Sequence, residues 1–282
     1  MEEPKWFATL MLSDILISVV MGAYYHRKTV DLLKRSVQSI LKQTYDNFEF
    51  IICDDGSSQE AVEYLEYCAQ QDTRIRLIRG LNRTDLATKL NACISASRGE
   101  FIARMDDDDY SYPERLSVQI KYLQSHPEVS FVGCWVKLIQ DGYPIGIRKM
   151  PEKPTVEDFL FTQPFVHPTL IFRKEVLEDI GGYSEKKYCE GCEDYDLLLR
   201  LYQYGYQGVN LAQTWFDYSL PNKGTTNRTF HMRVNEMRTR YIRYKSLNLL
   251  PEALPYVLKP IAVGMLPKKV LEIIKQKKYR SY

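Results

Sequence analysis

The chain has 282 residues, of which 45% are hydrophobic and 26% charged, and its formal net charge is +2 at pH 7. This composition is typical of a globular protein, and it excludes extensive disorder and gives no reason to expect a nucleic-acid partner. The charge is uneven, however. Residues 221–282 hold 14 Lys and Arg against three Glu, a net of +11, which leaves −9 for residues 1–220. We therefore expect an acidic body with a basic C-terminal segment.

The sequence predicts neither a membrane span nor a signal peptide. It contains no uninterrupted apolar run of about 18 residues, and its start is acidic where a signal peptide needs basic residues. The six cysteines follow no regular spacing, and Cys189 and Cys192 lack the second pair that a zinc site needs. These features favour a protein of the reducing cytoplasm.

The first 110 residues alternate short apolar runs with helical periodicity. The expected strands cover residues 15–21, 49–53, 75–78 and 101–105, and helix-like spacing of apolar residues lies between them. Such a βαβ series predicts a parallel sheet of the nucleotide-binding type. Because the loops after parallel strands meet at one edge of the sheet, residues 54–55 and 106–109 should converge there.

The second half of the chain predicts a mixed arrangement. We expect a helix from about residue 113 to 123, a turn at residues 141–144 and a helix over residues 193–204 that Gly205 ends. Strands are expected near residues 129–136 and 169–172.

Four consecutive aspartates, Asp106 to Asp109, follow the fourth expected strand. Adjacent carboxylates repel one another, so a folded chain keeps them together only if solvent, Lys, Arg or a metal offsets their charge. The position at the end of a strand favours Mg2+ or Mn2+, which take carboxylate oxygens and share them with phosphate. A solvated acidic turn is the alternative.

A second acidic pair, Asp54-Asp55, follows the second expected strand and leads into Gly56-Ser57-Ser58. The glycine permits a tight turn, and the hydroxyls are suited to cap the next helix. Helix capping alone would explain this pattern. Together with the later acidic run, the pair instead suggests a site in which one carboxylate recognises a base or ribose while the other cluster holds a metal on a diphosphate.

Several sequence blocks within residues 15–204 match one known family. They are Ile17-Ser18-Val19-Val20-Met21 with Tyr24, Gln43-Thr44-Tyr45, residues 50–58, Leu90-Asn91-Ala92, residues 98–109, Gly181-Gly182-Tyr183 and Glu193-Asp194. On these blocks the chain resembles the family 2 glycosyltransferases. The resemblance implies the α/β GT-A fold, with a Rossmann-like nucleotide-binding half, a mixed sheet and an acceptor-binding half.

The resemblance also implies roles for individual residues in binding the donor. Asp106 and Asp108 fall on the D-x-D positions that hold Mn2+ or Mg2+ against the diphosphate of a nucleotide sugar, while Asp107 or Asp109 contributes to sugar or neighbouring contacts. Asp54 or Asp55 falls where uracil and ribose are recognised. The base and ribose would pack near Ala23 and Tyr24, and Lys89 is a candidate for contact with phosphate or uracil, although a solvated helix lysine is an equal alternative.

On the acceptor side, the resemblance places the catalytic base at Asp194. A carboxylate in the first turn of a helix also has a purely structural explanation, because the helix dipole favours it. His167 and Glu193 are candidates for the acceptor pocket. His231 is a candidate third metal ligand, with an ordinary surface histidine as the favoured alternative.

The expected organisation is a glycosyltransferase domain over residues 1–220, divided into a nucleotide-sugar half (15–110) and an acceptor half (111–220), followed by a basic helical extension (221–282). A basic amphipathic extension suits an anionic membrane surface with a lipid-linked acceptor, which would make the protein peripheral at the inner face of the membrane. A helical extension packed on the core is the equal alternative.

The resemblance therefore implies a metal-dependent, inverting enzyme that moves a sugar, expected to be UDP-linked, to a hydroxyl of a glycan or lipid-linked acceptor in surface polysaccharide assembly. The Gln-x-x-Arg-Trp motif and membrane helices of processive members do not occur, which favours transfer of a single sugar. A sugar-phosphate nucleotidyltransferase is the first alternative. Such an enzyme needs a glycine-rich phosphate-binding loop near its N-terminus, and residues 21–24 match that loop poorly. A non-catalytic nucleotide-sugar-binding protein is the second.

Overall fold

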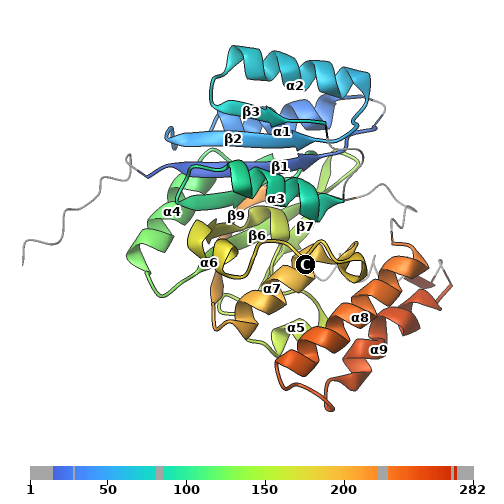
Figure 1. Cartoon of the computed structure of the whole chain (residues 1–282). Coiled ribbons are helices and arrows are strands. Elements are labelled where there is room, and N and C mark those ends of the chain that lie inside the picture. Colours follow the sequence, from blue (N-terminus) through green and yellow to red (C-terminus); the bar gives the residue numbers. More distant parts are fainter. Residues whose placement is uncertain (1–14, 28, 81–84, 221–227, 268–269, 272–282) are drawn as a thin grey trace, which may run out of the picture.

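A computed structural model describes residues 15–27, 29–80, 85–220, 228–267 and 270–271. In this part of the chain nine strands form one sheet in the order β3-β2-β1-β4-β8-β6-β9-β5, and β7 pairs with β6 beside that path. Helices cover the sheet, and α7, α8 and α9 gather below it in Figure 1.

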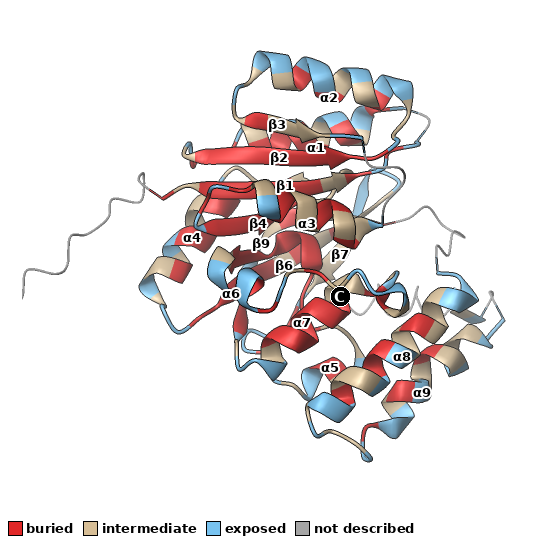
Figure 2. Ribbon diagram, in the orientation of Figure 1, coloured by how far each residue is buried: buried red, intermediate tan, exposed pale blue. Residues whose placement is uncertain are grey.

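The first half is the expected parallel βαβ series. β1 pairs in parallel with both β2 and β4, and β2 pairs in parallel with β3. Its elements are β1 (Ile17–Ala23), α1 (Asp31–Leu41), β2 (Phe48–Asp54), α2 (Gln59–Gln71), β3 (Ile75–Ile78), α3 (Leu86–Ala96) and β4 (Phe101–Arg104). Figure 2 shows that β1 and β2 are buried along nearly their whole length, as parallel strands covered on both faces must be.

The second half adds strands in both directions, so the sheet as a whole is mixed. β8 runs antiparallel to β4, and β6 runs antiparallel to β8 but parallel to β9. Its elements are β5 (Tyr110–Ser111), α4 (Arg115–Ser125), β6 (Phe131–Gln140), β7 (Tyr143–Arg148), α5 (Asp158–Phe161), η2 (His167–Thr169), β8 (Ile171–Arg173), α6 (Lys174–Asp179), η3 (Lys187–Cys189), α7 (Glu193–Gln203) and β9 (Gly208–Ser219).

Two details of the second half differ from the sequence-based expectation or refine it. The strand expected at 169–172 begins only at Ile171, because Thr169 belongs to the 3-10 turn η2 and its hydroxyl donates to the Val166 carbonyl. The turn expected at 141–144 is the two-residue loop of the β6–β7 hairpin. Asp141 and Gly142 there have φ values of 53° and 82°, the left-handed conformation that joins twisted antiparallel strands.

The C-terminal segment is helical where the structure describes it, with α8 (Phe230–Ser246) and α9 (Leu254–Gly264). α8 packs on α7 through Asp196, which is fully buried and forms ion pairs with Arg200 at 2.8 Å and Arg243 at 2.7 Å. The Tyr195 and Tyr244 hydroxyls share a hydrogen bond of 2.7 Å beside them. Residues 268–269 and 272–282 of the expected basic extension lie outside the described residues. No helix in the described part of the chain combines the length and hydrophobicity that a bilayer crossing demands.

We expect Asp196→Ala to lower the free energy of unfolding by about 3–5 kcal/mol, since it leaves two guanidinium groups without their carboxylate in the interface between α7 and α8. Urea unfolding would measure the loss. Glu178→Ala is the control, because Glu178 is 59% exposed and forms only a 3.5 Å pair with Lys174. That change should cost less than about 1 kcal/mol. Equal losses in both variants would contradict the importance we give to Asp196.

Candidate active site

The carboxyl ends of β1, β2 and β4 lie side by side and carry the expected site residues. The loop after β1 is tied to the loop after β2: the Ser57 hydroxyl accepts from the Tyr25 N–H at 2.8 Å, and the Ser58 N–H donates to the Tyr25 carbonyl at 2.9 Å. Ser58 is the N-cap residue of α2, yet its side chain makes no capping bond. The expected role of these hydroxyls as helix caps is therefore wrong, and Ser57 instead shapes the edge of the site.

The four consecutive aspartates have four different surroundings. Asp106 pairs with Arg104 at 2.5 Å, and Asp108 pairs with Arg27. Asp107 accepts a long bond of 3.4 Å from the Tyr24 N–H. Asp109 is fully buried and accepts from the Ser219 N–H at 2.7 Å, so it joins the run to the end of β9.

The negative charge of the run is incompletely balanced. The pKa of Asp108 is raised to about 7, first by burial and then by the charges of Asp106 and Asp107, against the opposing effect of Arg27. The pKa of Asp107 rises to about 6, again through burial first and then the Asp106 charge. Burial likewise holds the pKa of Asp109 well above its usual range. An added cation at this place would relieve the repulsion.

The donor set fits a divalent cation. The side chains of Asp106 and Asp108 are 31% and 21% exposed, so their oxygens are accessible from the site. Within the described residues no group of three or more His, Cys, Asp or Glu is arranged to hold an ion. One or two carboxylates completed by phosphate oxygens and water are what Mg2+ commonly uses. His231, exposed in the first turn of α8, is not brought into a cluster with these aspartates.

Asp54 and Asp55 are both buried beneath this edge. Asp54 is the last residue of β2, level with Ala23 in the register of the sheet. One of its carboxylate oxygens is buried without a hydrogen-bond partner among the described residues. Since a buried acceptor without a partner is costly, this oxygen is suited to receive a donor from a ligand.

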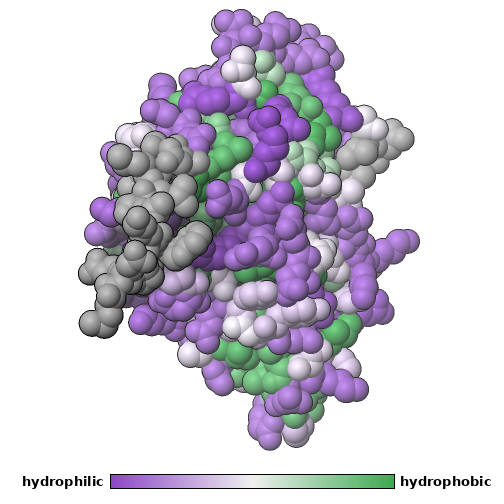
Figure 3. All heavy atoms as spheres, turned by 60° about the vertical axis from the view of Figure 1, so that its left-hand side comes forward, coloured by the Kyte–Doolittle hydropathy of each residue, from purple (hydrophilic) through white to green (hydrophobic). Residues whose placement is uncertain are grey.

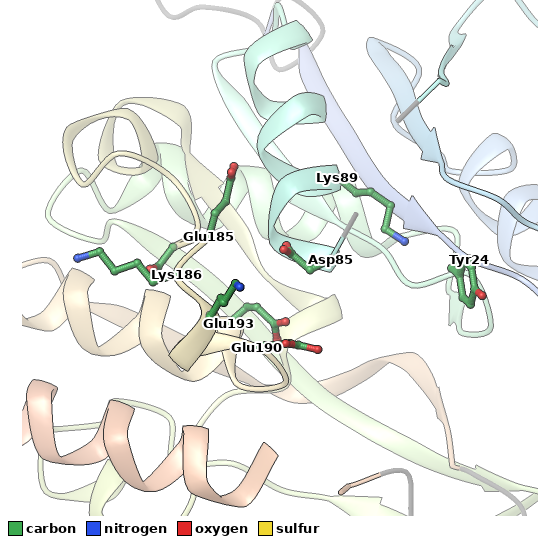
Figure 4. A pocket seen from close by; sticks show the side chains of 9 residues that line it. Tyr24, Asp85, Lys89, Glu185, Lys186, Glu190 and Glu193 are labelled. Atoms are coloured by element: carbon green, nitrogen blue, oxygen red, sulfur yellow. The ribbon is translucent and has the colours of Figure 1, made fainter. Parts of the chain in front are cut away.

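A cavity of about 610 Å³ opens beside these strand ends. Tyr24 and Lys89 lie on one side, Asp85 lies at the start of α3, and Glu190 and Glu193 lie on the opposite side (Figure 4). The Lys89 ammonium donates to the Ala23 carbonyl at 3.2 Å and lies 5.4 Å from the centre of the Tyr24 ring. Lys89 is therefore a buried cation on the wall of the cavity rather than a solvated helix lysine.

The buried Tyr183 contacts His167 and lies within the influence of the Asp194 and Asp106 charges. The His167 ring shares a hydrogen bond of 2.6 Å with the Tyr183 hydroxyl. Burial raises the pKa of Tyr183; the nearby positive charge of Arg104 lowers it, whereas the negative charges of Asp194 and Asp106 raise it. The charges of the candidate base and of the acidic run therefore both act on one buried phenol. Asp194 itself accepts from the Tyr195 N–H at 2.8 Å and is partly exposed.

Three residues of this region were not predicted as site residues. Arg27 forms the ion pair with Asp108, and the Tyr183 hydroxyl bonds to His167. Ser219 binds the backbone and a side chain of the acidic run. Tyr183 lies in a matched sequence block, Gly181-Gly182-Tyr183, and could have been found there. Arg27 and Ser219 carried no local signal, because their partners are far away in the sequence.

The family model described as "Glycosyl transferase family 2" matches residues 18–181. A Bacillus subtilis protein named as the glycosyltransferase EpsE is 31% identical over 262 residues, which cover 93% of each chain. The O-antigen biosynthesis glycosyltransferase WbnJ of Escherichia coli is 34% identical over 217 residues, or 74% of this chain and 82% of WbnJ. The chain belongs to glycosyl transferase family 2.

Two solved structures share its fold. S. aureus TarS 1-349 in complex with UDP-GlcNAc aligns with a TM-score of 0.67 over 87% of this chain and 73% of that chain, at 17% identity. The mannosyltransferase PcManGT of Pyrobaculum calidifontis, in complex with GDP-Man and Mn2+, aligns with a TM-score of 0.60 over 94% of this chain and 82% of that chain, at 18% identity. The expected GT-A fold is confirmed.

The buried His167 predicts a specific pH dependence of stability. Burial, followed by the charge of Arg104, lowers the pKa of His167 to about 3. Below the ordinary histidine pKa of about 6.5 this histidine is protonated in the unfolded chain but stays neutral in the folded chain. The free energy of unfolding therefore decreases as the pH is lowered. Lowering the pH from about 7 to about 5 should reduce the free energy of unfolding by about 2 kcal/mol through this group alone.

Urea unfolding at both pH values, compared between the wild type and His167→Gln, would measure this contribution. The variant should lose about 2 kcal/mol less than the wild type on acidification. Exchange of the exposed His231 for Gln is the matched control and should leave the pH dependence unchanged. An identical pH dependence in the wild type and His167→Gln would show that His167 titrates normally in the folded protein.

Proposed function

We propose that the protein transfers one sugar from a nucleoside diphosphate sugar, with UDP as the expected nucleotide, to an acceptor hydroxyl with inversion at the anomeric carbon. The observation that carries this proposal is the 610 Å³ cavity, which opens between the strand ends and the start of α7. Lys89 and Tyr24 line its donor side, and Glu193, next to Asp194, lines the opposite side. The donor-binding candidates therefore face Glu193 across this cavity, and the base candidate Asp194 is the next residue in the chain.

The donor side would recognise base and ribose through Asp54 or Asp55 and through packing near Ala23 and Tyr24. The ring of Tyr24 offers a flat face, and the neighbouring Lys89 ammonium offers a positive charge to phosphate. Asp106 and Asp108 would hold Mn2+ or Mg2+, with Asp107 next to them. A bound divalent ion would stabilise the negative charge that builds on the leaving diphosphate. His231 remains a weaker candidate ligand.

On the acceptor side, Asp194 would accept the proton of the attacking hydroxyl. A carboxylate within hydrogen-bond reach of the hydroxyl makes the oxygen a better nucleophile, and one base opposite one leaving group implies inversion. Glu193 and His167 would help to position the acceptor. His167 does this indirectly, since its ring bonds to Tyr183 rather than facing the cavity.

The relatives favour a role in cell-surface polysaccharide assembly, because WbnJ is named for O-antigen biosynthesis. We extend this role to the present chain and expect residues 1–220 to act as the transferase domain, with residues 15–110 for the donor, 111–220 for the acceptor and 221–282 as an appended segment. The expected place of action is the cytoplasm, at the inner face of the membrane where the acceptor is lipid-linked.

The base assignment predicts that Asp194→Asn lowers the turnover number by roughly 100- to 10,000-fold while the affinity for the nucleotide sugar stays within about twofold. The amide oxygen can still accept from the Tyr195 N–H, so the fold should be kept. Glu175→Gln, an exposed carboxylate on α6, is the control. Steady-state kinetics and calorimetric titration of the donor would separate the two effects. Turnover retained in Asp194→Asn would remove this residue from the base role.

Donor binding should depend on a divalent ion and on the acidic run. We expect a nucleoside diphosphate sugar from a screened panel to raise the melting temperature more with Mn2+ than without it, because a ligand that binds the folded state adds up to about 2.7 kcal/mol at 100 times its dissociation constant. Asp108→Asn should remove the Mn2+-dependent part, and Glu175→Gln should keep it. If no nucleotide sugar gives a metal-dependent shift, the proposed function is wrong.

A further inference from the structure

A second cavity, of about 240 Å³, lies close to the donor cavity, since adjacent residues of the chain line the two. Glu193 lines the donor cavity, whereas Asp194 lines this second cavity together with the ends of α5, α8 and α9. Its charged lining residues are Asp194, Arg228, Arg233, Glu236, Arg240 and Lys259. Four cations thus face two carboxylates.

Inside the cavity the carboxylates offset only part of this positive charge. Glu236 is shared by two arginines, since it pairs with Arg228 and also accepts from Arg240 at 3.0 Å. The Arg233 guanidinium makes no hydrogen bond or ion pair with any residue that the structure describes. Its partial burial lowers its pKa, and the like charge of Arg228 lowers it further. An anion between these side chains would relieve this repulsion.

The cations come from separate segments that other contacts fix in place. Arg228, just before α8, donates to the Gly191 carbonyl at 3.1 Å, and Lys259 on α9 donates to the Phe161 carbonyl. Gly191 belongs to the turn that leads into Asp194. The positions of the cations and of the candidate base are therefore coupled through a short backbone segment.

We infer that this cavity binds the phosphate or diphosphate group of the acceptor and so presents a hydroxyl of the acceptor to Asp194. The inference rests on the proposed function, since it names the acceptor class of the same enzyme. Guanidinium groups match phosphate oxygens in forked pairs of hydrogen bonds, and the excess of two positive charges in the lining suits a group of that charge.

Exposed apolar side chains lie on the three helices that line the cavity. Phe161 at the end of α5 lines the cavity and is 62% exposed. Phe230 on α8 and Leu258 on α9 are 56% and 57% exposed. Figure 3 shows hydrophobic residues among hydrophilic ones at the lower end of the face that it presents. The phosphate can therefore belong to a lipid carrier or to a water-soluble sugar phosphate, and the experiment below separates these sources.

Inorganic pyrophosphate is the probe for the anion site. Calorimetric titration of the full chain in EDTA excludes binding through a metal at the donor side. We expect Arg233→Ala to weaken pyrophosphate binding by roughly 10- to 100-fold, as the loss of charged hydrogen bonds predicts. Arg238→Ala, an exposed arginine on the same helix that does not line the cavity, should bind like the wild type. Equal affinity in the wild type and Arg233→Ala, or no binding by the wild type, would overturn the inference.

Arg233→Lys serves as a second variant that keeps a positive charge but loses the fork, and its affinity should lie between those of the wild type and Arg233→Ala. Folding of every variant is checked by its melting temperature. The metal-dependent shift with a nucleotide sugar is measured in parallel. If that shift is absent while pyrophosphate binding depends on Arg233, the proposed function is wrong and the anion site is supported. If the shift is present but pyrophosphate binding does not depend on Arg233, only the anion site is rejected.

The source of the phosphate is identified with phosphatidylcholine vesicles that contain a polyprenyl diphosphate. Arg233-dependent sedimentation with these vesicles, but not with phosphatidylcholine alone, supports a lipid-linked acceptor. Arg233-dependent binding of pyrophosphate without such sedimentation supports a soluble phosphorylated acceptor. Sedimentation that is the same in Arg233→Ala and the wild type contradicts a role of the cavity in lipid binding.

Discussion

A buried ion pair at the end of β4 organises the whole site. The Arg104 side chain is only 1% exposed and pairs with Asp106 at 2.5 Å. A guanidinium without a partner at this depth would cost several kcal/mol, so the acidic run has to begin where it does. Arg115, also fully buried, donates to the carbonyls of Arg104 and Pro168 and so joins α4, β4 and the segment before β8.

This pair also explains how carboxylates of different character coexist within a short distance. Two buried arginines lie beneath the run, yet Asp107 and Asp108 still have raised pKa values because burial and their acidic neighbours outweigh the nearby positive charge. In the absence of a ligand, the nearby arginines therefore do not fully balance the negative charge of the acidic run. The charge of Arg104 also acts on the buried, uncharged His167 and Tyr183.

Sequence patterns predicted the parallel half of the fold well and the other half only in part. Strands β1 to β4 are rich in apolar residues and alternate with amphipathic helices, and such patterns depend on local burial alone. By contrast, β9 alternates buried and exposed positions irregularly, with register shifts against β6 near Trp135, and its end at Ser219 matters because it binds Asp108 and Asp109. Long-range partners of this kind leave no local pattern. The acidic residues could be found by type and spacing, whereas their distinct partners required the fold.

The change from parallel to antiparallel pairing between β4 and β8 has a consequence for how such an enzyme diversifies. The strands that end at or just before Tyr24, Asp54 and Asp106 are hydrogen-bonded among themselves. Among the described residues, Arg228 before α8 contacts the turn before α7, and Arg243 on α8 pairs with Asp196 on α7. Exchange of the two C-terminal helices between related chains therefore leaves the parallel strands untouched. Chimeric proteins with transplanted α8–α9 hairpins would therefore change the proposed anion site and keep the proposed donor site.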